Sequence, residues 1–475
     1  MSTIPQNTSL IKHLFELLQA HRPIFKQERI YQRVVALVLA EIFVFARHTV
    51  TQMLMSLGMV EQDWSAWYRL FSARRFVYDK ACEVLFGETL KHVSEDDVYV
   101  VGVDGTQTPR SSRKLEGSGW LRNLRTPPFM TGIHAAQRWS NGSWLVPAEK
   151  GYSRAVPLRW MPAFTEKSQP KAHEPRKEWQ AALDFVIWLR EQLARCGRIK
   201  QQVLMVGDGS YDNINLWHNL PEGVVLMARS AKNRVLYALP KPSSGRGRKP
   251  LYGERVLKPQ ERWGGDEGRK GWRALDLEVR GRTRHLQCKV SEPVMRRGAP
   301  DCVMFLIVVR GKKRKNKYGK FYRREPLPFL VNAVQNDAGA WVLPLPIETL
   351  LFWAWQRWEL EVCHREIKAN FGLDNKQCFN PHSAVLSVQW SAWVYSLLLL
   401  AGYRTWGLCG APDVPTRWWR GSQRWSLNTL WRAYRSELWQ HEQFHPLCTP
   451  TSRDWGEKEL LLMALRNAVL ASARA

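Results

Sequence analysis

Two apolar runs that both end in Asp-Gly limit most strongly what this chain can fold into. The first, VYVVGVDGTQTP, covers residues 98–109, and the second, QQVLMVGDGSYDN, covers residues 201–213. Continuous β-branched runs of this kind are typical of central strands that are buried on both faces of a sheet. A third apolar strand is expected over residues 223–230. These three runs predict a sheet at the centre of the protein.

The residues between the first two runs predict a hairpin and a helix. Strands are expected over 129–137 and 143–150, with Asn141-Gly142 as the turn between them, and a helix is expected over 174–196. This succession of strands and helices predicts a mixed α/β fold.

Asp104 and Asp208 stand at the predicted ends of the two strands, where open α/β sheets place their ligands. One such Asp on its own is more often a turn or helix cap. If both converge with a third carboxylate, Glu361, they form an all-oxygen site suited to Mg²⁺ or Mn²⁺.

Glu361 belongs to residues 348–371, which contain no Gly or Pro and are predicted to form one helix. At about 100° per residue, one stripe of this helix carries Arg357, Glu361, His364 and Lys368. Apolar residues flank the stripe, so the helix is expected to be mostly buried. The stripe is either an internal ladder of salt bridges or a polar cleft in which Glu361 holds a metal while Arg357 and Lys368 hold phosphates.

The composition points to a polyanionic partner. The chain has 475 residues and a formal net charge of +27, with 70 Lys and Arg against 43 Asp and Glu. Two to four domains are expected at this length, and nucleic acid is the commonest partner of so basic a chain. A membrane surface is less favoured because the longest apolar runs, 34–45 and 391–401, are shorter than the roughly 20 residues that a bilayer requires. The N-terminus lacks the pattern of a signal peptide, so an intracellular protein is expected.

Two regions outside the predicted sheet are candidates for contacts with DNA. Short helices over 49–57 and 63–71, followed by Arg74 and Arg75, fit a helix-turn-helix element or equally any small helical bundle. Residues 232–325 carry 27 Lys and Arg against 9 Asp and Glu, and they are β-rich. This region is predicted to be an inserted module that lies along DNA. Its expected DNA-binding residues are Arg246, Arg248, Lys249, Lys312, Lys313, Arg314 and Lys315.

Taken together, these motifs resemble those of DDE transposases, whose catalytic domain is ribonuclease-H-like. Asp104, Asp208 and Glu361 correspond to the triad, and the resemblance covers about residues 98–402. It is closest to a branch from bacterial insertion sequences that has a β-rich insert and the signature Y-x2-R-x3-E-x6-K. Arg357, Glu361 and Lys368 match this signature, while Ala354 stands at the Tyr position, with Trp355 beside it. The runs DGT, GDGSYD and FGLDNKQ are also similar to the family's.

The resemblance implies a fold and a division of the chain. The expected fold is a ribonuclease-H-like mixed α/β sheet, interrupted by a β-rich basic insertion and flanked by helical N- and C-terminal regions. The expected segments are a helical DNA-end-binding or dimerisation region (1–95), two parts of the catalytic domain (96–231 and 329–405), the insertion (232–328) and a helical C-terminal region (406–475).

The resemblance also implies an activity. It predicts that the protein cleaves transposon ends by metal-dependent hydrolysis and joins the 3′-hydroxyl to target DNA, with two Mg²⁺ or Mn²⁺ ions per active site. Asp104 is expected to bridge both ions, with Asp208 and Glu361 each completing one. Arg357 and Lys368 are expected to contact phosphates, and His364 either does likewise or packs as an ordinary polar residue. Asp212 and Glu366 are nearby carboxylates that serve as comparisons for the triad.

The expected partner is double-stranded DNA, at both the transposon ends and the target. A homodimer is expected in the synaptic complex, while the free protein is compatible with a monomer. The expected location is the cytoplasm, in association with the nucleoid. Two alternatives stay open: a catalytically inactive transposase-derived DNA-binding regulator, and a ribonuclease-H-like nuclease that acts on other nucleic-acid substrates.

Overall fold

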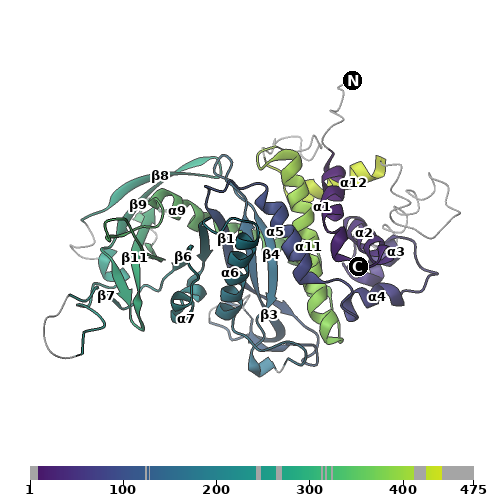
Figure 1. The fold of residues 1–475 in the computed structure, drawn as a ribbon, viewed down its shortest axis with the longest axis horizontal. Helices are drawn as coiled ribbons and strands as arrows, with labels where there is room; N and C mark the ends of the chain where they lie inside the picture. Colours follow the sequence, from purple (N-terminus) through teal and green to yellow (C-terminus); the bar gives the residue numbers. More distant parts are fainter. Residues whose placement is uncertain are drawn as a thin grey trace, which may run out of the picture.

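The computed structural model describes residues 9–123, 126–127, 129–168, 170–241, 248–263, 270–311, 314–315, 318–322, 325–410 and 424–440. Within these residues one large mixed sheet occupies one half of an elongated molecule, and a helical bundle occupies the other. A long helix, α11 (Pro381–Trp406), runs between them (Figure 1).

The centre of the sheet is β1 (Tyr99–Pro109). It pairs in parallel with β5 (Val203–Gly207) on one side and antiparallel with β3 (Ile133–Leu145) on the other. The sheet continues through β6 (Val224–Arg229), parallel to β5, and through β4 (Ala155–Pro162), antiparallel to β3. This mixed sheet with helical flanks confirms the predicted ribonuclease-H-like fold class.

Shorter elements complete this part of the chain. They are β2 (Gly119–Arg122), the 3-10 helices η2 (Glu166–Ser168) and η3 (Gly209–Tyr211), and the helices α6 (Glu178–Arg195) and α7 (Ile214–His218). The strand β2 pairs with the first residues of β3, and α6 packs against the later part of β3.

Strands from the basic region extend the same sheet beyond β6. Next to β6 lies β14 (Leu327–Asn332), followed in order by β11 (Ala299–Gly311), β10 (Val294–Arg296) and β7 (Leu236–Ala238). From β11 branch β9 (Arg282–Val290) and β8 (Arg273–Val279). Other elements here are α8 (Pro259–Trp263), β12 (Arg314–Lys315), β13 (Phe321–Tyr322), β15 (Val334–Gln335) and β16 (Trp341–Val342). Figure 1 shows this half of the sheet on the side of the core away from the N-terminal helices.

The N-terminal region is helical, as predicted. Its elements are α1 (Leu10–Ala20), η1 (Arg22–Ile24), α2 (Glu28–Phe43), α3 (Val50–Ser56), α4 (Ser65–Ser72) and α5 (Tyr78–Leu90). The C-terminal α12 (Leu427–Gln440) joins this bundle, because the Glu437 carboxylate accepts hydrogen bonds from the first backbone N–H groups of α1. The two ends of the described chain therefore pack together.

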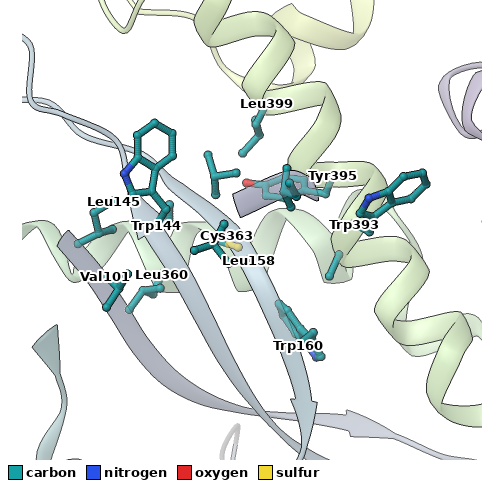
Figure 2. Packing of buried hydrophobic residues seen from close by; sticks show 14 of the residues in the cluster. Val101, Trp144, Leu145, Leu158, Trp160, Leu360, Cys363, Trp393, Tyr395 and Leu399 are labelled. Carbon is teal, nitrogen blue, oxygen red and sulfur yellow. The ribbon is translucent and has the colours of Figure 1, made fainter. Parts of the chain in front are cut away.

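Helix α11 is, among the described residues, the one helix long and apolar enough to span a membrane, and 94% of its apolar window is buried inside the protein. One side packs against β4 and another against α1, α4 and α5. Its burial is that of a core helix. Figure 2 shows how this packing reaches the sheet, with Tyr395 and Leu399 of α11 near Leu158 of β4 and Cys363 of α10 (Trp358–Asn370).

The predicted Asn141-Gly142 turn is wrong. β3 continues through both residues, with a shift in its register with β4 between Gly142 and Ser143, and the chain reverses later, at an isolated bridge between Glu149 and Tyr152. Gly142 is needed here for space, because a Cβ at this position would lie 2.6 Å from the ring of Phe185 on α6. The Asn-Gly pair, which is typical of turns, is therefore part of a strand here, where its role is in packing and side-chain contacts.

Two further expectations need correction. Residues 348–371 form two helices, α9 (Ile347–Gln356) and α10, which are separated at Arg357. Here the Leu360 N–H donates to the Arg357 carbonyl three residues earlier, whereas an α-helix uses the carbonyl four residues earlier. The chain therefore makes one tighter turn of the 3-10 type. Asp104 lies inside β1 and not at its end, since β1 continues to Pro109 through its pairing with β3.

Candidate active site

Asp104 and Asp208 lie side by side although only one of them ends a strand. The parallel pairing of β1 with β5 finishes at Val103 and Gly207, so the two Asp residues follow the last paired positions. Neighbouring strands are about 4.8 Å apart, which places the two carboxylates at one edge of the parallel pair. Asp208 also caps η3, with Oδ1 accepting a hydrogen bond of 2.8 Å from the Ser210 N–H.

Glu361 reaches the same place from the first turns of α10. Its Oε1 accepts a hydrogen bond of 2.6 Å from Arg357 Nη2, and Arg357 Nη1 lies 3.6 Å from Asp104 Oδ2. The break between α9 and α10 therefore puts the Arg357 guanidinium between two acids of the predicted triad. The sequence left open whether Arg357 and Glu361 form a salt bridge at i, i+4 spacing. This salt bridge is present, and it lies beside Asp104.

The electrostatics of the site centre on Asp104. Burial raises the pKa of its carboxyl to about 7; the Arg357 guanidinium opposes this shift, and the charges of Asp208, Glu361 and Glu178 add to it. A carboxyl that is almost completely buried among other acids resists ionisation, because a single guanidinium does not offset the cost of burying its charge. Such a group favours the binding of a cation.

The donor set suits a hard divalent cation, because Asp104, Asp208 and Glu361 offer only carboxylate oxygens. Nevertheless, no group of three or more His, Cys, Asp or Glu side chains in the described part of the chain is arranged to hold a metal ion. Glu361 is instead hydrogen-bonded to Arg357. The three residues nevertheless fit a divalent cation in the chemistry of their side chains.

His364 lies in the interior and faces Asp104. Its Nδ1 is 3.8 Å from Asp104 Oδ2, its Nε2 is 3.3 Å from Asn141 Nδ2, and its ring meets Trp160 edge-on at 5.3 Å. Burial together with the nearby Lys368 and Arg357 lowers the pKa of His364 to about 3, so the imidazole is neutral. Because Asn141 donates to Nε2, the ring proton sits on Nδ1 and points toward the carboxylate. A phosphate contact by this ring stays a prediction.

The other predicted DNA contacts are dispersed. Lys368 is half-buried near His364; Arg248, Lys249 and Lys315 are exposed on the basic region. Arg74 is exposed and donates to His382 Nδ1 at 2.8 Å, and Arg75 is half-buried. Arg314 lies in β12. Arg246, Lys312 and Lys313 lie outside the described residues.

The two comparison carboxylates have other partners. Asp212 is fully buried and accepts hydrogen bonds from Trp217, Ser230 and Arg296, with Arg234 beside it. Glu366 accepts from Arg154 at 2.8 Å and from the Tyr395 hydroxyl at 2.6 Å. Both are satisfied structural acids.

Sequence reasoning missed three polar residues beside the site. Asn141 was assigned to a turn, yet it stands directly opposite Asp104 in the β1–β3 register. Glu178, the first residue of α6, is paired with Arg138 and occupies the space into which a side chain on Gly105 would project. Glu178 lies on a helix outside the predicted triad segments, so the spacing of residues in the sequence did not indicate that it would lie beside the site.

Glu359, the third, connects the active-site helix to distant segments. Its buried carboxylate accepts from Arg280 at 2.8 Å and from Arg424 at 3.0 Å. Arg280 is the turn of the β8–β9 hairpin, whose backbone also bonds to Lys150 and Gly151. The basic region is thereby held against α10, two residues before Glu361.

Ala354, at the Tyr position of the signature, opens onto a pocket of about 300 Å³. Arg357 and Arg280 line this pocket together with Trp355 and Trp358, which are 40% and 46% exposed. Aromatic side chains are therefore available beside Arg357 despite the Ala.

Comparison with known proteins assigns the chain. A family model described as "DDE superfamily endonuclease" matches residues 22–285, more than half of the chain. The matched segment contains Asp104 and Asp208 and ends before Glu361. A search of curated proteins gives no match. With Asp104 in β1 and Asp208 directly after the neighbouring β5 of a mixed sheet, and with this match, the chain belongs to the family of DDE superfamily endonucleases.

Proposed function

We propose that the protein is a DNA transposase of the insertion-sequence type. It binds the ends of its element, cleaves them by metal-dependent hydrolysis, and joins the freed 3′-hydroxyl to target DNA. The observation that carries this proposal is the Asp104 carboxyl, which is buried beside Asp208 and Glu361 with its pKa raised to about 7. Endonucleases with the DDE arrangement generally use divalent metals, and this cluster of acids is the place in the described chain that suits them.

Asp104, Asp208 and Glu361 would hold two Mg²⁺ or Mn²⁺ ions, with Asp104 shared. When bound, such a pair activates the attacking oxygen and stabilises the leaving oxygen of an in-line displacement. The chain's own residues do the rest. Glu361 would hold an ion in place of its hydrogen bond to Arg357, and the Arg357 guanidinium would then neutralise a DNA phosphate together with Lys368. His364, held by Asn141, faces the Asp104 carboxylate at 3.8 Å.

The partner in this proposal is double-stranded DNA. The net charge of +27 and the 27 Lys and Arg of residues 232–325 support it, because DNA is a polyanion. The β-strands of that region continue the catalytic sheet. The β8–β9 hairpin contacts α10 through the hydrogen bond from Arg280 to Glu359. DNA held by the basic region would therefore lie near the predicted catalytic acids. A homodimer on two DNA ends, in the cytoplasm and associated with the nucleoid, completes the proposal.

The test is cleavage and joining by the purified protein. A plasmid that carries the coding region with its flanking DNA is incubated with Mg²⁺, with Mn²⁺ or with EDTA. We expect cutting at the element's boundaries with either metal, joining of the 3′ ends to a second plasmid, and no reaction in EDTA. Metal-dependent cutting of RNA–DNA hybrids in preference to duplex DNA supports the alternative nuclease instead. Tight DNA binding without cutting under any condition supports the regulator.

A further inference from the structure

The β2–β3 hairpin exposes apolar side chains on one face. Trp120 pairs with Ala135 and Arg122 with Ile133, so Trp120, Arg122 and Ile133 share a face. Trp120 is 60% exposed and Ile133 is 62% exposed; near the tip, Phe129 is 87% and Met130 is 56% exposed. Apolar side chains that cluster on a solvent-exposed face mark an interaction surface.

The opposite face of the hairpin is packed, which shows that its orientation is fixed by the fold. Helix η2 lies against β2. On β3, His134 Nε2 bonds to Gln107 Oε1 of β1 at 3.0 Å, and Leu121 of β2 stands opposite His134. The exposed residues therefore belong to a supported strand pair with one covered and one open face.

The open face is the face on which the catalytic acid lies. Asp104 stands opposite Asn141 on β3, and Ile133 is eight residues from Asn141, so alternation places Ile133 on the same side of the sheet. At about 3.4 Å per residue the distance along the strand is roughly 27 Å. That distance spans about 8 base pairs of duplex DNA at 3.4 Å each.

The charge around the open face indicates which kind of partner binds there. Of the six Lys and Arg in residues 110–138, Arg113, Lys114 and Arg122 are exposed, and the segment has the single acid Glu116. Glu116 is buried and accepts hydrogen bonds from the backbone of Lys171 and Ala172, so it offers no charge to a partner. The Arg113 guanidinium lies over the Trp120 ring at 5.9 Å. A second copy of a chain with charge +27 brings like charge to this face, whereas DNA brings the opposite charge.

We propose that the open face of the β2–β3 hairpin (Trp120, Arg122 and Ile133, with Arg113 over Trp120 and with Phe129 and Met130 near the tip) binds duplex DNA about 8 base pairs from the scissile phosphate. The arginines contact the backbone, and the apolar side chains enter the groove or wedge into a base step, as in proteins that bend DNA. The position of the scissile phosphate at Asp104 rests on the proposed function. The hairpin contact extends the footprint beyond the catalytic acids.

The first experiment compares Trp120→Ser/Phe129→Ser/Ile133→Ser with Ile199→Ser. Ile199 is 64% exposed and precedes β5, at the end of the sheet away from the acids, so it controls for loss of an exposed apolar side chain. The probes are 15- and 40-base-pair duplexes of one sequence, taken from the DNA that flanks the coding region. We expect the triple variant to bind the 40-base-pair duplex about 10-fold more weakly, a loss of roughly 1.4 kcal/mol. Its affinity for the short duplex and the affinities of Ile199→Ser change less than twofold.

The second experiment uses the unmodified chain, so it does not depend on how the variant folds. Single 5-iodouracil bases are placed stepwise along the 40-base-pair duplex, and crosslinked peptides are identified after irradiation. We expect crosslinks to Trp120 or Phe129 from positions about 8 base pairs from the cut. Equal affinity of triple variant and wild type for the long duplex, without such crosslinks, overturns the proposal.

Loss of dimers on DNA in the triple variant, with unchanged affinity per chain, assigns the face to a second copy and also overturns the DNA contact. If the wild type never cuts DNA but the length effect and the crosslinks are found, the proposed function fails while the hairpin remains a DNA-binding face. The two failures are therefore distinguishable.

Discussion

Asp104→Asn should make the metal-free protein more stable at pH 8. The pKa of Asp104 rises from 3.8 in the unfolded chain to about 7 in the folded protein. The folded state therefore binds the proton more tightly, and the stability that this proton contributes is complete below about pH 4 and is lost as the pH rises through about 7. Asn carries no charge to bury. At about 1.4 kcal/mol per pKa unit, its advantage at pH 8 is up to roughly 4 kcal/mol.

Urea unfolding in EDTA at pH 5 and pH 8 measures this difference. The advantage of the Asn variant should grow with pH between about 4 and 7 and level off above that range. A variant that is no more stable than the wild type at pH 8 shows that Asp104 is adequately compensated in the folded protein. The argument for an uncompensated site for a cation then fails.

Glu361→Gln should abolish cutting while it preserves DNA binding. The substitution keeps the size of the side chain and its hydrogen bond to Arg357 but removes the charge that a metal ligand needs. We expect the cleavage rate to fall by about a thousandfold or more, equivalent to roughly 4 kcal/mol of transition-state stabilisation. DNA affinity should stay equal or rise slightly, because one negative charge leaves the site.

The matched control is Glu366→Gln, which makes the same change on the same helix. Glu366 bonds to Arg154 and Tyr395 and faces away from Asp104, so its loss should lower stability and leave cutting per folded molecule intact. Plasmid cleavage and binding to labelled duplex, measured for both variants, separate the two roles. If Glu361→Gln cuts as fast as wild type, the Arg357–Glu361 pair is a structural ladder.

Much of the fold was predictable because its signals are local. The runs over 98–109 and 201–213 could hardly be anything other than buried strands, and they became the neighbours β1 and β5. The β-rich character predicted for residues 232–325 is also found, chiefly in β8, β9 and β11. Their union with the catalytic sheet was not predictable, since strand order depends on pairings between residues far apart in sequence.

The errors concern residues whose role is set by distant partners. Asn141-Gly142 has the chemistry of a turn, but Gly142 makes room for Phe185 and Asn141 reaches His364. Arg357 looked like one position in a continuous helix, yet the chain tightens there and brings its guanidinium to Asp104. Glu178 gave no signal because only the packing of α6 on the sheet brings it near Gly105. Local propensity yields where tertiary contacts are stronger.

The central claim is that Asp104, Asp208 and Glu361 hold the same metal centre. Fe²⁺ in place of Mg²⁺ or Mn²⁺, treated with ascorbate and peroxide, generates radicals that cut the polypeptide close to the bound ion. We expect fragments from cuts near residues 104, 208 and 361 together, suppressed by excess Mn²⁺ and absent in Asp104→Asn. Cuts confined to other segments, or cuts near 104 and 208 that persist without any near 361, would contradict the shared site.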